Sequence, residues 1–211
     1  MGGTRDILTG FIVLEGLDGS GTTTQAKVLA ARLKENGYTV HLTAEPTDGP
    51  IGTMIRDALH RRTPLETTTL AYLYAADRYE HLWGGRNSIT SMLREGLVVS
   101  DRFVFSSLAY QSTYAPEDLV EQLNASFPFP EHLIYVDVTP ETAEERRAGR
   151  ADPDIFEHLE FQRTVAARYE EVLAACEGTA MQVHRIDGAA TQEVVAERIW
   201  ESLGIAPINE V

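Results

Sequence analysis

Positive charge and sulfur are scarce in this chain of 211 residues. Aspartate and glutamate total 32 against 18 lysines and arginines, and the formal net charge of −14 opposes non-specific binding to nucleic acid or to anionic membranes. Only two of the cations are lysines, Lys27 and Lys34. The lone cysteine, Cys176, excludes an internal disulfide framework and favours a reducing cytoplasm.

Long apolar runs, repeats and low-complexity tracts are also missing. No apolar stretch is long enough to span a bilayer, and no signal-peptide pattern is present. We therefore expect a cytoplasmic protein that has no membrane or nucleic-acid partner. The length and the 43% hydrophobic content predict one globular domain over residues 1–211.

Short segments rich in Val, Ile and Leu alternate with helical patterns along the chain. We expect strands at 11–15, 39–43, 97–100, 133–138 and 182–186. We expect helices at 24–36, 51–60, 68–82, 87–94, 141–147, 156–176 and 191–203. Near-continuous apolar strands with helical crossovers indicate an α/β fold whose parallel sheet is covered on both faces. A polar stretch with several helix breakers between two helices predicts a short lid at about residues 146–156.

A glycine-rich loop follows the first expected strand. From Gly16 to Thr23 it matches the phosphate-binding pattern G-x-x-x-x-G-K-[ST], except that Thr22 stands at the lysine position. Glycines let successive N–H groups point at an anion, and the next helix adds its own free N–H groups. The predicted phosphate contacts are Gly16, Gly19, Ser20, Gly21, Thr22, Thr23 and Thr24.

The missing lysine leaves two interpretations open. Loss of one preorganised charged donor costs roughly 10²–10³ in rate in other enzymes. Either another cation replaces that charge, or the protein binds nucleotide without turning it over.

An Asp-Arg pair follows the third expected strand, at the sheet edge where α/β proteins bind ligands. The Thr23 hydroxyl and the Asp101 carboxylate are suited to Mg²⁺, and Arg102 could bridge two phosphate groups. The histidines show no metal-ligand spacing. This pattern favours phosphoryl transfer.

The residues quoted so far belong to an extensive resemblance. The blocks 11–21, Glu45-Pro46, 72–78 with His81, and 101–111 occur in an order and spacing that resemble those of thymidylate kinases, from Phe11 to about Leu203. The resemblance implies a three-layer P-loop kinase fold, transfer of a phosphoryl group from ATP to dTMP with Mg²⁺, and a homodimer. The alternatives are a kinase of another pyrimidine nucleotide or deoxynucleoside, and an inactive nucleotide-binding homologue.

The resemblance also implies an acceptor site. Tyr74 would stack on thymine, Arg78 would donate to its O4, and Ser107 and Gln111 would hydrogen-bond the base edge. Tyr110 would lie under the sugar, where it would exclude a 2′-hydroxyl. Asp18, Glu45, Arg56 and Arg102 would surround the acceptor phosphate and the metal, and Asp18 and Arg102 would take part in catalysis.

Cations near the predicted lid are the candidates to replace the lysine. Arg146, Arg147 and Arg150 are available, and we favour Arg150 as the catalytic one, folding over the γ-phosphate, with Arg146 contacting the bound nucleotide. Lys27, one helical turn past Thr23, is a weaker candidate.

Overall fold

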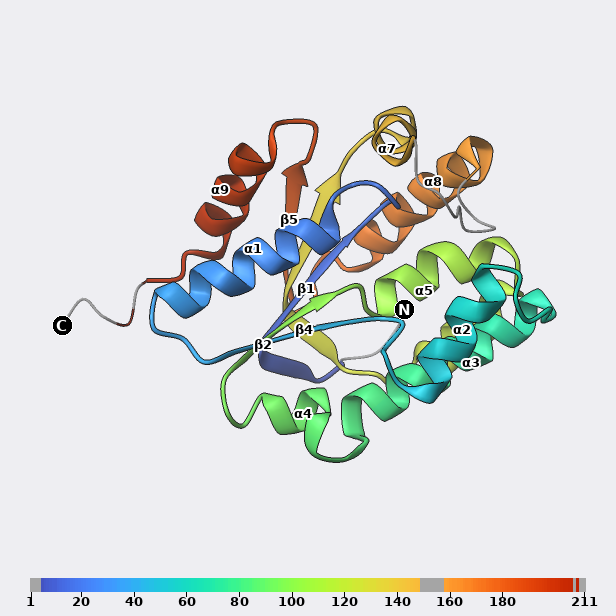
Figure 1. Cartoon of the computed structure of the whole chain (residues 1–211), viewed down its shortest axis with the longest axis horizontal. Helices are drawn as coiled ribbons and strands as arrows, with labels where there is room; N and C mark the ends of the chain where they lie inside the picture. The colour runs from blue at the N-terminus through green and yellow to red at the C-terminus, as the bar shows by residue number, and fades with distance from the viewer. Residues whose placement is uncertain (1–4, 149–157, 207, 209–211) are drawn as a thin grey trace.

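The computed structural model describes residues 5–148, 158–206 and 208. A five-stranded parallel sheet in the order β2-β3-β1-β4-β5 forms its centre (Figure 1). The strands are β1 (Ile7–Gly16), β2 (Val40–Ala44), β3 (Leu97–Asp101), β4 (Phe129–Asp137) and β5 (Gln182–Asp187). All five predicted strands are present, and the predicted α/β class is confirmed.

Two helices, α1 (Thr22–Glu35) and α9 (Gln192–Leu203), cover one face of the sheet. Alternate side chains of the central strands, such as Ile12 and Leu14 of β1, pack against them. Because successive strand residues point to opposite faces, Phe11 and Val13 enter the other core.

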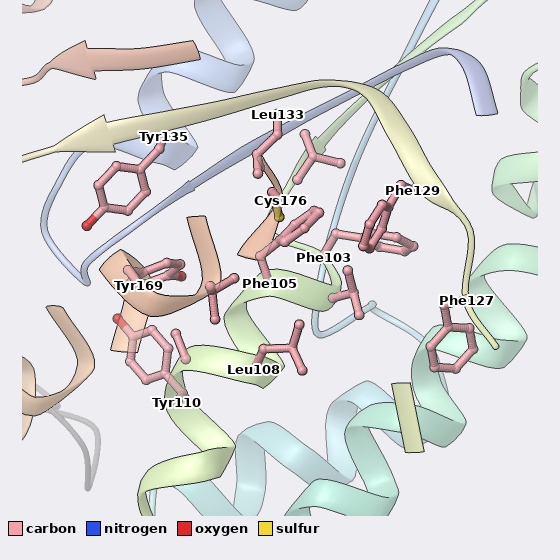
Figure 2. Close-up of a cluster of buried hydrophobic side chains, with 14 of the residues drawn as sticks. Phe103, Phe105, Leu108, Tyr110, Phe127, Phe129, Leu133, Tyr135, Tyr169 and Cys176 are labelled. Atoms are coloured by element: carbon pink, nitrogen blue, oxygen red, sulfur yellow. The ribbon is translucent and has the colours of Figure 1, made fainter. Parts of the chain in front are cut away.

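The second face is covered by α3 (Thr67–Trp83), α5 (Val104–Tyr110), α6 (Glu117–Asn124), α7 (Pro140–Arg147) and α8 (Leu159–Ala175). Its core is rich in aromatic rings (Figure 2), including an edge-to-face pair of Phe11 and Phe103 with centroids 5.1 Å apart. Cys176 is buried in this cluster, and burial raises the pKa of its thiol to about 11. The cysteine is therefore a core residue.

A smaller apolar cluster joins α2 (Pro50–Leu59) to α3 through Ile55, Leu59 and Leu70. The helix predicted over 87–94 is wrong in extent, because a 3-10 turn at Gly85–Asn87 precedes a single helical turn, α4 (Ile89–Met92). No helix in the described part of the chain is long and apolar enough to cross a membrane.

The carboxyl ends of β1 and β3 bring the predicted motifs together. Leu14 pairs with Asp101 in the parallel register, so the P-loop at the end of β1 starts next to the Asp-Arg pair at the end of β3. α7 packs closely on the loop, since a Cβ added to Gly19 would collide with the carbonyl oxygen of Ala143. This edge of the sheet is where the candidate site lies.

Candidate active site

The P-loop has the backbone conformation that an anion site needs. Gly19 and Gly21 have φ of 94° and 100°, values that favour glycine over other residues. The loop closes with a hydrogen bond from the Ser20 N–H to the carbonyl oxygen of Leu17 at 2.9 Å. No side chain caps α1, which starts at Thr22, so its first N–H groups face the loop without a side-chain acceptor.

Thr23 and Asp101 lie together at the mouth of this loop. The Thr23 hydroxyl donates to Oδ2 of Asp101 at 2.5 Å, whereas Oδ1 of Asp101 is buried and has no hydrogen-bond partner. This oxygen donor set fits Mg²⁺, which usually takes one or two protein ligands beside substrate phosphates. No cluster of three or more His, Cys, Asp or Glu side chains that could hold a metal occurs among residues 5–148 and 158–206. The prediction that Thr23 and Asp101 would hold the ion rests on this pair of oxygen donors.

Arg102 is held in an unusual backbone conformation. Its φ is 73°, in the left-handed region that costs a residue with a side chain roughly 1–2 kcal/mol. The Arg102 N–H donates to the Leu14 carbonyl oxygen at 2.9 Å, and the Arg102 carbonyl oxygen accepts from the Ser100 hydroxyl at 2.7 Å. With this backbone conformation the Arg102 guanidinium lies at the P-loop. It donates to Asp18 Oδ1 at 2.5 Å and to the Gly16 carbonyl oxygen at 2.9 Å.

A buried carboxylate, Glu15, shares hydrogen-bond partners with Arg102. It accepts hydrogen bonds from the Phe103 N–H at 2.8 Å, the Ser106 hydroxyl at 2.5 Å and the Tyr169 hydroxyl at 2.9 Å. The same two hydroxyls lie 3.1 and 3.3 Å from a guanidinium nitrogen of Arg102. Burial raises the pKa of Glu15, and Arg102 with these donors acts in the opposite direction.

A cavity of about 160 Å³ opens beside Arg102. Seven of the nine predicted acceptor residues line it: Asp18, Glu45, Tyr74, Arg78, Arg102, Tyr110 and Gln111. The Tyr110 hydroxyl accepts from the Asp18 N–H at 2.9 Å, so the wall of the cavity is joined to the P-loop. The Gln111 side chain is buried, and its Oε1 has no hydrogen-bond partner.

The other two predicted residues lie just behind the wall. Ser107 accepts from Arg78 at 2.9 Å, and Arg56 donates to the carbonyl oxygens of Pro46 and Thr47 at 3.0 and 2.7 Å. The structure therefore puts Ser107 behind Arg78 and uses Arg56 to fix the turn before α2.

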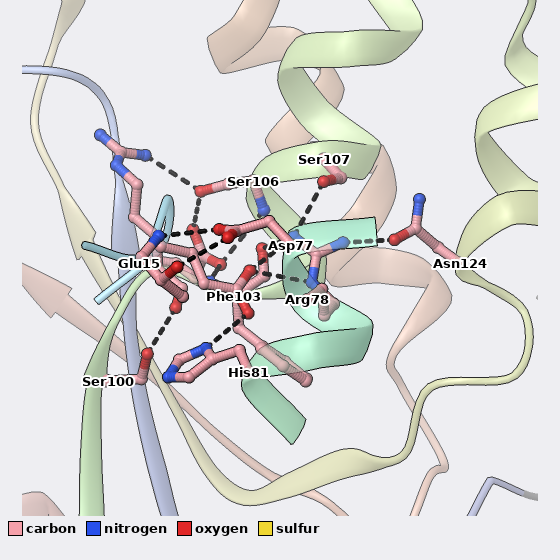
Figure 3. Close-up of polar contacts among 12 residues, drawn as sticks. Glu15, Asp77, Arg78, His81, Ser100, Phe103, Ser106, Ser107 and Asn124 are labelled. Carbon is pink, nitrogen blue, oxygen red and sulfur yellow. Dashed lines mark hydrogen bonds and ion pairs between the residues drawn. The ribbon is translucent and has the colours of Figure 1, made fainter. Parts of the chain in front are cut away.

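Arg78 is almost fully buried, at 1% exposure, and several groups fix it (Figure 3). It makes an ion pair with Glu45 at 2.7 Å and donates to Asn124 at 2.5 Å. Glu45 also contacts the His81 ring at 3.0 Å. Burial raises the pKa of Glu45, but Arg78 and His81 outweigh it and hold the pKa below its usual value. Glu45 is thus ionised.

Known proteins with similar sequences have a function that agrees with this arrangement of residues. The family model described as thymidylate kinase covers residues 14–199. A putative thymidylate kinase of Treponema pallidum is 40% identical over 202 residues, which cover 94% of this chain and 96% of that protein. The chain belongs to the thymidylate kinase family. A putative thymidylate kinase of Aeropyrum pernix is 36% identical over 206 residues, covering 92% of this chain and 98% of that protein. A probable thymidylate kinase of Methanococcus maripaludis is 40% identical over 172 residues, or 81% of each chain.

This thymidylate kinase family member has a second cavity next to the P-loop, separate from the predicted acceptor cavity. It measures about 210 Å³ and is lined by Ser20, Gly21, Thr24, Gln25 and Arg146, together with residues after β5. Arg146 donates to the carbonyl oxygens of Ser20 at 3.3 Å and Gly188 at 2.8 Å. Arg146 therefore joins the loop to the end of β5, in a position to contact a bound nucleotide.

The structure describes only part of the predicted lid. Arg150 and residues 149–156 of the predicted lid lie outside the described residues. Arg147 is within them, and its guanidinium donates to the carbonyl oxygen of Asp18.

Several residues of the site were missed by sequence reasoning. Glu15, Ser106, Tyr169 and Asn124 all contact one of the two central arginines or support its position. A carboxylate within the apolar strand at 11–15 is a usable signal, because a buried charge needs partners. Nothing local marks Asn124, whose partner Arg78 is 46 residues away.

Proposed function

We propose that this protein transfers the γ-phosphoryl group of ATP to dTMP, giving ADP and dTDP. The observation that supports it most strongly is the cavity beside the P-loop, which gathers seven predicted acceptor residues at the carboxyl end of β1 and β3. Family membership supports the same reaction.

The groups in the cavity suit a deoxypyrimidine. The unpartnered Oε1 of Gln111 is an acceptor for an N–H on the base edge, and the fixed Arg78 is a donor for a carbonyl oxygen. The Tyr74 ring lines the same cavity and can stack on the base. Tyr110 is held by Asp18, and its fixed ring would crowd a 2′-hydroxyl.

The transfer needs little covalent chemistry from the protein. A dTMP phosphate oxygen forms a bond to the γ-phosphorus as the bond from that phosphorus to the β,γ-bridging oxygen breaks, and no proton must move. Arg102, joined to Asp18 and Gly16, would align donor and acceptor phosphates, and the N–H groups of the P-loop would hold the β-phosphate. Mg²⁺ held by Thr23 and Asp101 would offset the charge of the donor phosphates.

A homodimer is part of the proposal. Met54, Tyr72, Tyr79 and Trp83 on α2 and α3 are 48%, 52%, 60% and 40% exposed, which is an unusual concentration of large apolar side chains. A second copy would cover this face. The proposal also puts the protein in the cytoplasm, with nucleotides as its substrates.

The test is MgATP-dependent ADP formation with dTMP, dUMP, UMP, CMP and thymidine as acceptors. We expect turnover with dTMP, much weaker turnover with UMP and CMP, and none with thymidine, which has no phosphate for Arg102 to align. Equal rates on UMP and dTMP would favour the broader pyrimidine kinase. Tight ATP binding without turnover on any acceptor would favour the inactive homologue.

A further inference from the structure

The second cavity next to the P-loop, which we call the donor cavity, has a buried polar atom with incomplete hydrogen bonding in its wall. Gln25, in the first turn of α1, lines this cavity of about 210 Å³ and is 4% exposed. Its Oε1 has no hydrogen-bond partner among residues 5–148, 158–206 and 208. A buried amide oxygen without a partner is unfavourable, so a ligand that brings a hydrogen-bond donor would be stabilised there.

The orientation of the Gln25 amide is fixed by its other end. Its Nε2 donates at 2.9 Å to the carbonyl oxygen of Gln192, the first residue of α9, which lies beside α1 on the same face of the sheet (Figure 1). A backbone carbonyl oxygen only accepts, so the amide nitrogen faces Gln192 and the amide oxygen does not. Gln25 therefore presents a fixed acceptor at the α9 end of the donor cavity.

The opposite end of the donor cavity belongs to the P-loop. Ser20 also lines the cavity, and its hydroxyl lies so close to the strand end that a Cβ added to Gly16 would come within 2.5 Å of it. A hydroxyl can both donate and accept, so Ser20 selects no particular ligand group. The Oε1 of Gln25 only accepts, and its partner must carry an N–H or an O–H.

The size and the two ends of the cavity indicate which part of a nucleotide meets Gln25. Pockets for whole drug-sized ligands measure roughly 300–1,000 Å³, so about 210 Å³ leaves room for one ring system. The N–H groups of the P-loop and of the start of α1 would hold the phosphates. The ring at the α9 end is then the base, which would lie next to Ala190 and Val195.

We propose that Gln25 selects the base of the phosphoryl donor, with its Oε1 accepting a hydrogen bond from the 6-amino group of adenine. This rests on the proposed function. A 6-oxo purine would place a carbonyl oxygen opposite Oε1, and the amide cannot turn to offer Nε2 without giving up its bond to Gln192. A site that hydrogen-bonds one substrate group rejects the analogue that lacks it. Gln25 is therefore a specificity residue that favours ATP over ITP, whose purine carries the 6-oxo group.

Turnover on dTMP is measured with ATP and with ITP as donors, for wild type and Gln25→Met, which keeps the length of the side chain and removes the amide. We expect wild type to have a kcat/KM about tenfold or more higher for ATP. Gln25→Met should lower kcat/KM about tenfold for ATP and leave the value for ITP nearly unchanged. Gln122→Met, an exposed change on α6, is the matched control and should alter neither value. A wild-type preference below about threefold, or a variant that keeps the wild-type preference, would overturn the inference.

Nucleotide affinity gives a readout that does not need turnover. Titration calorimetry with Mg²⁺ should show that Gln25→Met weakens ADP binding about tenfold and leaves IDP binding nearly unchanged. Gln25→Leu, which also lacks the amide, covers the case in which the methionine variant does not fold and should give the same result. Equal weakening for both nucleotides would mean that Gln25 only joins α1 to α9, and would overturn the inference.

The two assays separate this inference from the proposed function. A wild type that is inactive on dTMP but binds ADP more tightly than IDP, with the difference lost in Gln25→Met, would refute the proposed function and leave the role of Gln25 standing. A wild type that phosphorylates dTMP equally well from ATP and ITP would leave the proposed function standing and overturn the role of Gln25.

Discussion

The Tyr169 hydroxyl donates to Glu15 at 2.9 Å, across 154 residues of sequence, and both side chains are fully buried. The bond joins α8 to the central strand β1 next to Arg102. Burial raises the pKa of Tyr169 well above its usual value, so the phenol keeps the proton that it donates. Arg102 lies 3.3 Å from the same oxygen, which links the helix after the predicted lid to the arginine over the P-loop.

Tyr169→Phe removes this link and leaves the ring in the core. We expect the free energy of unfolding to fall by about 1–3 kcal/mol, because a buried carboxylate loses a donor, and kcat to fall with it. Urea unfolding and steady-state kinetics measure the two effects. Tyr38→Phe, which loses a hydroxyl bonded to the Ala206 carbonyl oxygen away from the site, is the control and should leave kcat unchanged. An unaltered kcat in Tyr169→Phe would show that Arg102 is held without it.

The backbone at Arg102 predicts that two truncation variants differ in stability and share a loss of activity. At φ 73°, glycine relieves a strain that alanine keeps, so Arg102→Gly should be more stable than Arg102→Ala by about 1–2 kcal/mol. Both variants lose the guanidinium, and kcat should fall by roughly 10² or more in each. Equal stability of the two variants in urea would mean that Arg102 is unstrained.

The chemistry at the strand ends could be predicted from the sequence because it is local. The strand periodicity places two motifs, the P-loop and the Asp101-Arg102 pair, at one edge of a parallel sheet, and the register of Leu14 with Asp101 brings them next to each other. The acceptor residues came from the family resemblance, and seven of them line one cavity.

The supporting contacts could not be predicted in the same way. α5 is buried on nearly every side, with Val104, Phe105, Leu108 and Ala109 all in the core, so it shows no amphipathic period. The predicted helix at 87–94 breaks because Gly85, at φ 79°, and the Ser88 cap confine α4 to one turn. Which cation lies on the P-loop depends on how α7 packs, which is a tertiary property.

A substitution of Gln111 should change dTMP binding without lowering the stability of the fold. Its Oε1 is a buried acceptor without a partner, so Gln111→Leu should leave the free energy of unfolding unchanged or raise it. The KM for dTMP should rise about tenfold, because a base N–H loses its acceptor. Steady-state kinetics in dTMP and urea unfolding test the two halves, and a stable variant with a normal KM would remove Gln111 from base recognition.

A histidine pair at the opposite end of the sheet predicts a loss of stability in mild acid. His132 Nδ1 and His184 Nε2 are 3.0 Å apart on β4 and β5, an arrangement that needs one donor and one acceptor and hence at least one neutral ring. Burial lowers the pKa of both, and each lies below its usual value of 6.5.

The direction in which the free energy of unfolding changes with pH follows from proton binding. Below pH 6.5 the unfolded chain binds protons that the folded pair does not, so the free energy of unfolding falls as the pH decreases from about 7.5 to 5.5. Urea unfolding at the two pH values, for wild type and His184→Gln, isolates the pair from carboxylates that titrate in both proteins. The variant should lose less stability in acid than wild type, and an equal or greater loss would contradict the prediction.

The exposed apolar face on α2 and α3 predicts the oligomeric state. Tyr79 and Trp83 pack edge to face with centroids 4.7 Å apart, while both stay open to solvent on one side. Exposure of such rings is unfavourable unless a second surface covers them. Tyr79→Glu would put a charge into that interface and should convert a dimer to a monomer, as measured by sedimentation equilibrium at micromolar concentration. Val194→Glu introduces the same charge at a similarly exposed apolar residue of α9, on the other face of the sheet, and should keep the wild-type mass. A wild type that sediments as a monomer would refute the dimer, whereas a Tyr79→Glu variant that stays dimeric would require a different interface.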